Sequence, residues 1–127
     1  MLVVRLDSPV PLVEQIVAGL RSAIASGELR PGDALPTVRQ LAADLGINLN
    51  TVARAYRTLE GHGLVTTRRG RGTEIAAARD AVGREPPELA RRLREVLADA
   101  RLAGLDRAAV RRLVDDELDA LWQEDDP

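Results

Sequence analysis

Residues 37–61 read TVRQLAADLGINLNTVARAYRTLEG, which contains two helical patterns separated by a glycine. Thr37 is a candidate N-cap for the first helix. Gly46 is placed to end that helix, because glycine readily adopts the left-handed conformation that follows a helix. The second pattern begins a few residues later, with Asn48 or Asn50 as its candidate cap. Two helices joined by such a short turn are typical of a helix-turn-helix.

The segments on either side of this pair complete a small domain. Before it, apolar residues at helical spacing predict a helix over about residues 11–26. After it, residues 63–67 and 73–76 are predicted strands, joined by a basic turn over 68–72. We therefore expect a winged helix-turn-helix domain over residues 1–76.

The remainder of the chain predicts a helical tail. Residues 77–87 change composition and end in Glu-Pro-Pro, which predicts a linker. Residues 88–127 contain two amphipathic helical patterns separated by Gly104, with Asp106 as the candidate cap of the second. The expected fold is mainly α with a small β-hairpin, a winged helix-turn-helix followed by a two-helix dimerisation tail.

Dimerisation is expected because two helices alone cannot bury both of their apolar stripes. The helices either fold back on the winged domain or meet the same pair from another chain. The Pro-Pro linker favours a homodimer, since it holds the helices away from the winged domain. The candidate interface residues are the large apolar side chains of the two stripes: Leu89, Leu93, Val96, Leu97, Val110, Leu113, Val114, Leu118, Leu121 and Trp122.

Composition excludes several classes of protein. The 127 residues include no cysteine and one histidine, so thiolate chemistry, disulfides and histidine-rich zinc sites are excluded. No apolar run approaches the roughly 20 residues that a membrane helix needs, and no signal peptide is recognisable, so we expect a cytoplasmic protein. The net charge of −2 is uneven. Residues 1–79 hold ten arginines against seven acidic residues, whereas residues 80–127 hold eight against thirteen.

Candidate DNA-contacting residues follow from the expected motif. The second helix of a helix-turn-helix lies in the major groove with its first residues at the base edges. Asparagine can pair with adenine, threonine can touch a thymine methyl group, and arginine reaches guanine or phosphate. Asparagine is also a frequent helix cap, so both roles stay open. A basic turn between glycines can approach the DNA backbone closely. The candidates are Arg39, Asn48, Asn50, Thr51, Arg54, Arg68, Arg69, Gly70, Arg71 and Gly72.

This stretch resembles the GntR family of bacterial transcription regulators over about residues 9–76. The matching pieces are Pro11-Leu-Val-Glu-Gln-Ile16, Gly27-Glu-Leu-Arg-Pro-Gly32, Leu35-Pro-Thr-Val-Arg-Gln-Leu-Ala42, Leu45-Gly-Ile-Asn48, Asn50-Thr-Val52, Ala55-Tyr56, Leu59-Glu60, Gly63-Leu-Val65 and Gly70-Arg-Gly-Thr73. The short tail is similar to the YtrA-like branch, which implies dimerisation and, often, control of a transporter operon. The resemblance implies DNA contacts by Thr37, Arg39, Asn50, Thr51, Gly70 and Gly72.

Three residues depart from the family's pattern. Leu49 and Ala53 stand where many relatives carry arginine, so the operator sequence does not carry over. Glu74 stands at the usual aromatic position of the wing's return strand. A tail of about forty residues cannot supply the large effector or aminotransferase-like domain of other branches, and no small-molecule effector is identified.

The sequence leaves two alternatives to a regulator. The acidic residues Asp115, Asp116, Glu117, Asp119 and Glu124–Asp126 could in principle hold a divalent cation, but neither a loop glycine nor a fixed ligand spacing supports a metal site. The second alternative is a protein-interaction module in which the helix-turn-helix has only a structural role. We expect a sequence-specific regulator, a repressor that binds an inverted-repeat operator in double-stranded DNA as a homodimer, without enzymatic activity, cofactor or metal.

Overall fold

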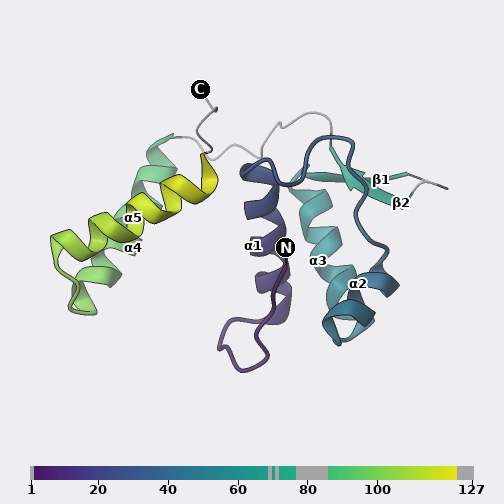
Figure 1. Ribbon diagram of the computed structural model, residues 1–127, viewed down its shortest axis with the longest axis horizontal. Coiled ribbons are helices and arrows are strands. Elements are labelled where there is room, and N and C mark those ends of the chain that lie inside the picture. The colour runs from purple at the N-terminus through teal and green to yellow at the C-terminus, as the bar shows by residue number, and fades with distance from the viewer. Residues whose placement is uncertain (1, 69, 71, 77–85, 123–127) are drawn as a thin grey trace. The chain divides into compact units, whose positions relative to one another are not determined.

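The computed structural model describes residues 2–68, 70, 72–76 and 86–122, which belong to two compact units (Figure 1). The first unit contains α1 (Leu12–Ala25), α2 (Val38–Leu45), α3 (Leu49–Gly61), β1 (Val65–Arg68) and β2 (Gly72–Ile75). The second contains α4 (Pro86–Leu102) and α5 (Arg107–Leu121). The prediction of a mainly helical fold with a small hairpin is confirmed. Within the described residues, every helix is too short or too polar to cross a membrane.

The helix-turn-helix begins and ends at capping residues. The Thr37 hydroxyl accepts a hydrogen bond from the Gln40 backbone N–H at 3.1 Å, and the Gln40 side chain accepts one from the Thr37 N–H at 2.9 Å. This reciprocal capping box satisfies two N–H groups that α2 would otherwise leave free. Gly46 ends α2 in the left-handed conformation, with φ of 67°. The cap of α3 is Asn48, whose side-chain oxygen accepts the Asn50 backbone N–H at 2.7 Å.

The core of the first unit lies among α1, α2, α3 and the hairpin. Its largest fully buried side chains are Ile16, Leu20, Val52, Leu59 and Val65. Tyr56 is also buried, and its hydroxyl donates to the Pro36 carbonyl at 2.7 Å, which ties α3 to the loop before α2. Burial raises the pKa of Tyr56 to about 12. The face of α3 that carries Val52 and Leu59 is thereby anchored, and its other face stays on the surface.

The wing is a hairpin whose second strand is paired along both edges. β1 and β2 are antiparallel, in a register that runs from Val65 opposite Ile75 to Arg68 opposite Gly72. The prediction that Arg68 and Gly72 lie in the turn is therefore wrong. Positive φ at Gly70 (81°) and Gly72 (75°) allows a tight turn, so the ladder extends to the pair of Arg68 and Gly72.

The other edge of β2 pairs with residues 32–35. The Ile75 N–H donates to the Asp33 carbonyl at 2.8 Å, and the Leu35 N–H donates to the Thr73 carbonyl at 2.9 Å. An isolated bridge joins Ala34 to Glu74. β2 is consequently held between this segment and β1, which fixes the base of the wing.

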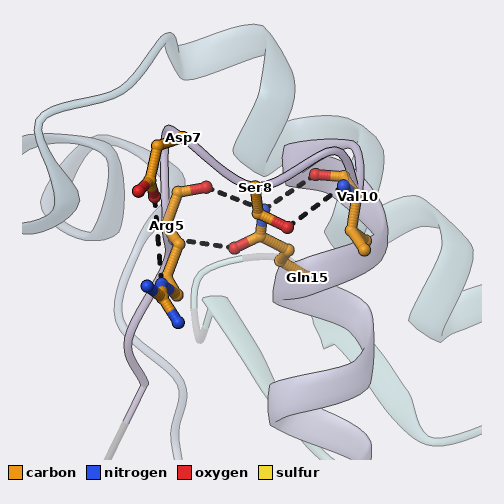
Figure 2. Close-up of polar contacts among 5 residues, drawn as sticks. All are labelled: Arg5, Asp7, Ser8, Val10 and Gln15. Atoms are coloured by element: carbon orange, nitrogen blue, oxygen red, sulfur yellow. Dashed lines mark hydrogen bonds and ion pairs between the residues drawn. The ribbon is translucent and has the colours of Figure 1, made fainter.

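Gln15 ties the segment before α1 to the helix (Figure 2). Its side-chain oxygen accepts the Arg5 N–H at 2.7 Å, and its amide nitrogen donates to the carbonyls of Arg5 (3.0 Å) and Val10 (2.8 Å). Further along, Gly19 lets Leu2 pack on α1, because a Cβ there would lie 2.3 Å from a Leu2 methyl group. The amino-terminal segment is therefore part of the first unit.

The second unit is a pair of helices joined by a short turn. α4 begins at Pro86, so the Pro-Pro pair predicted at the end of the linker lies in the first turn of a helix, where a missing N–H costs nothing. Residues 77–85 of the expected linker lie outside the described residues. Asp106 caps α5 as predicted, its carboxylate accepting the Ala109 N–H at 2.8 Å.

The apolar stripes of these two helices are open to solvent. Eight of the ten predicted interface side chains are more than a third exposed: Leu89, Leu93, Val96, Leu97, Leu113, Val114, Leu118 and Trp122. The other two, Val110 and Leu121, are half-buried. A groove of about 360 Å³ lies between the helices, with Leu93, Leu97, Val110 and Val114 as its apolar lining. The unit thus fails to cover its own apolar surface.

Candidate nucleic-acid interface

The first turns of α3 present polar side chains on the surface. Asn50 and Arg54 are exposed, and Thr51 is half-buried. Asn50 and Arg54 are four residues apart, so they share one face of the helix. The opposite face is fixed in the core, and this anchoring aims the exposed face outward as a rigid unit.

The two asparagines of α3 have different environments. The side-chain oxygen of Asn48 is engaged in the cap, which leaves its amide nitrogen for another partner. No partner for the Asn50 side chain is found among the described residues, and its backbone N–H is already satisfied by Asn48. Because bidentate pairing with adenine needs both the oxygen and the nitrogen of the amide, Asn50 is the better candidate for a base contact of the two.

The first turn of α2 lies beside this helix in the motif. Arg39 is exposed there, two residues after the Thr37 cap. The Thr37 hydroxyl accepts the Gln40 N–H and keeps its own O–H for a further acceptor. The structure therefore offers a cation and a hydroxyl at the start of α2.

The wing contributes one described arginine, and that arginine is paired. The Arg68 Nε lies 3.2 Å from the Glu74 carboxylate, and the two side chains are 58% and 21% exposed. On the inner side of the wing, the Thr67 hydroxyl donates to the Glu60 carboxylate at 2.9 Å and so joins β1 to α3. Arg69 and Arg71 lie outside the described residues. Sequence reasoning noted Glu74 only as a departure from a family pattern and missed its pairing with Arg68.

A second feature that sequence reasoning missed is an open groove between α1 and α3. It measures about 570 Å³, and its charged lining residues are Glu14, Arg54 and Arg57. The spacing of Arg54 and Arg57 on one helix was the available signal, since residues three apart are surface neighbours. Arg57, which was not among the predicted residues, therefore adds a second exposed arginine beside Arg54 on α3.

Acidic residues do not assemble a metal site in the described part of the chain. No group of three or more histidine, aspartate or glutamate side chains there could hold an ion. Within α5, Asp115, Asp116, Glu117 and Asp119 lie on the exposed surface. The remaining acidic residues of that prediction, 124–126, lie outside the described residues.

Comparison with known proteins matches the chain to a family. Residues 12–75 match the model of the bacterial regulatory proteins of the gntR family. The chain is similar to the HTH-type transcriptional repressor YtrA of Bacillus subtilis, at 38% identity over 101 residues that cover 78% of each chain. These matches include the helix-turn-helix, the wing and part of the tail.

Solved structures share the fold of this chain. A transcriptional antiterminator from Listeria monocytogenes is similar over 91% of this chain and 88% of its own, with a TM-score of 0.77 and 31% identity. The DNA-binding domain of AraR, solved in complex with its operator ORX1, is similar over 59% of this chain and 96% of its own, with a TM-score of 0.54 and 28% identity.

The matched residues coincide with the capped helix pair and the wing, which are the elements that carry the exposed polar side chains described above. Proteins of this family are regulators and not enzymes. The chain therefore belongs to the GntR family and is a DNA-binding transcription regulator.

Proposed function

We propose that the protein is a repressor that binds an inverted-repeat operator in double-stranded DNA as a homodimer. The observation that carries this proposal is the first part of α3, where the capped and anchored helix exposes Asn50 and Arg54 on one face. A side chain that must select a base needs a fixed direction, and the burial of the opposite face supplies it. Repression is supported by similarity to a protein named a repressor.

The phosphate contacts come from the residues around this helix. Arg39 at the start of α2, Arg54 on α3 and two of the three wing arginines would each neutralise one phosphate. A dimer then makes about eight such contacts, and its affinity falls by about 10³–10⁵ between 50 and 200 mM salt. Salt titration of binding to the promoter fragment of its own operon measures this dependence. An affinity that does not change with salt would contradict these assignments.

The site should have twofold symmetry. A dimer with one recognition helix per chain binds two half-sites whose centres are about 10 base pairs, or a multiple, apart. Footprinting on the same promoter shows the spacing directly. Protection of a single asymmetric half-site at saturation would contradict the twofold dimer, and failure to bind even sheared genomic DNA at low salt would favour a protein-interaction module.

The dimer interface is proposed on the open apolar faces of α4 and α5. A large apolar side chain contributes about 1.5–3 kcal/mol when it is fully buried, so the exposed stripes hold enough surface to offset the entropy of association. The groove between the helices is a place where side chains of a second copy could insert, because its lining is mainly aliphatic. The charged side chains of both helices are exposed to solvent.

A pair of leucines on α4 tests the interface. Leu97 lines the groove and is 37% exposed, whereas Leu102 lies at the end of the helix and is 86% exposed. Leu97→Glu should shift the protein to monomer in sedimentation, because a carboxylate cannot be buried in an apolar interface without a partner. Leu102→Glu, the matched control, should leave the dimer intact. Equal behaviour of the two variants would place the interface elsewhere.

A further inference from the structure

Arg68 and Glu74 form an ion pair on the surface of the wing. Glu74 lies opposite Thr66 in the hairpin register, and Arg68 follows Thr66 by two residues. Alternate residues of a strand share a face, so Arg68 and Glu74 are diagonal neighbours on the same surface of the wing. Their charged groups meet at 3.2 Å.

The side chains of Glu74 and Arg68 differ in how firmly the wing holds them. Glu74 lies on β2, which is held by β1 on one edge and by residues 32–35 on the other. Its side chain is only 21% exposed, whereas that of Arg68 is 58% exposed. The carboxylate is therefore the fixed member of the pair, and it stays on the wing surface wherever the arginine moves.

We propose that Glu74 limits the affinity of the wing for DNA by neutralising Arg68. This inference rests on the proposed DNA contact of the wing. A phosphate that approaches Arg68 also approaches the fixed carboxylate, and the repulsion between the two anions cancels part of the attraction. Arg69 and Arg71, next to this pair in the sequence, would carry the wing's phosphate contacts.

The ion pair also changes how many cations are released when the wing binds DNA. An arginine that binds a phosphate releases a condensed cation from the DNA, which makes binding weaken with salt. In this wing, Glu74 loses its partner when Arg68 turns to the phosphate, and the freed carboxylate attracts a cation in turn. The net release at Arg68 is then close to zero, so this arginine adds little to the salt dependence.

The experiment uses four full-length variants and a random-sequence DNA duplex, titrated by fluorescence anisotropy from 50 to 200 mM salt. Glu74→Gln removes the charge and keeps the shape of the side chain. Arg68→Gln removes the other partner, and the double variant removes both. Glu28→Gln is the matched control, because it makes the same change in net charge at an exposed position in the turn after α1. Thermal unfolding of each variant verifies the fold.

We expect Glu74→Gln to bind more tightly than wild type by about twofold to fivefold per wing, the range of an exposed ion pair, and so by about fourfold to 25-fold for a dimer. Its salt slope should steepen by about 0.9 per wing. Arg68→Gln should weaken binding by a similar factor, because it leaves the Glu74 carboxylate unpaired on the wing. The double variant should bind within about twofold of wild type. Glu28→Gln should leave the slope unchanged.

Three results would overturn the proposal. The first is Glu74→Gln binding equal to or weaker than wild type, as expected if the carboxylate only supports the hairpin. The second is a loss of more than about fivefold in the double variant, which would show that the arginine already contributes to binding in the wild type. In both cases the wild-type protein still binds DNA, so the proposed function is not contradicted. The third is an absence of DNA binding by the wild type itself, which would remove the proposed function as well.

Discussion

Asn48 and Asn50 have different tasks although they are two positions apart. The side-chain oxygen of Asn48 is engaged in the cap of α3, whereas the Asn50 amide faces solvent. Asn50→Ala should therefore cost about 1–3 kcal/mol of binding, mainly on the preferred operator, and leave the melting temperature unchanged.

Asn48→Ala is the matched control for this prediction. Loss of a cap should lower the free energy of unfolding by about 1 kcal/mol. Operator titration, random-DNA titration and thermal unfolding of both variants separate the roles. Equal loss of Asn50→Ala on operator and random DNA would show that Asn50 does not read a base.

Tyr56 links pH to stability because burial raises its pKa to about 12, above the ordinary value of 10.0. The folded state thus favours the neutral phenol. This contribution to the free energy of unfolding is complete below pH 10 and is lost as the pH rises from about 10 to 12. Tyr56→Phe should flatten that part of the pH profile and, by removing the hydrogen bond to Pro36, cost about 0.5–1.5 kcal/mol at neutral pH.

The titration can be followed without interference, since Tyr56 is the only tyrosine in the chain. Tyrosinate absorbance of the folded protein should rise with a midpoint well above that of the unfolded protein in denaturant. Coincident midpoints would contradict the raised pKa.

Among the elements, the turn of the helix-turn-helix depends on one backbone conformation. Gly46 has φ of 67°, and a Cβ there would meet no atom within 4 Å, so only backbone strain opposes a side chain. Gly46→Ala should lower the free energy of unfolding by about 1–2 kcal/mol. Gly61→Ala is the matched control, because Gly61 is the last residue of α3, has equal space and has no positive φ.

The control should have the opposite sign. Alanine loses less conformational entropy than glycine in a helix, so Gly61→Ala should be neutral or stabilising by up to about 1 kcal/mol. Chemical denaturation of both variants provides the comparison. A destabilisation of the same size at both positions would show that the turn tolerates other conformations.

At the level of the whole molecule, the two compact units should have separable functions. The first unit has its own core, so a chain that ends at Ala78 should stay folded. Without α4 and α5 it should sediment as a monomer. Its affinity for the operator should then fall by about 10²–10⁴, because the second half-site contact is no longer tethered to the first.

Sedimentation and operator titration of the full chain and the truncated chain test these functions together. Operator binding by the truncated chain at the affinity of the full chain would exclude a role of the tail in tethering. A full chain that is monomeric at micromolar concentration would exclude the proposed interface on α4 and α5.

The features that the sequence alone made predictable are those with short-range causes. The caps at Thr37 and Asp106 and the left-handed end at Gly46 depend on hydrogen bonds and φ angles within about one helical turn. Helical periodicity likewise identified the buried face of α3. Resemblance to a family supplied Thr37 as a DNA-contacting candidate, which helix periodicity would not have selected.

Other features required segments far apart in the chain to meet. Residues 32–35 carry no strand pattern, and their pairing with β2 exists because folding places that backbone beside an edge whose N–H and C=O groups need partners. The three wing arginines are alike in sequence, yet the hairpin register sets Arg68 beside Glu74. Whether a charge is free or neutralised depends on distances of a few ångströms, and only the folded backbone sets such distances.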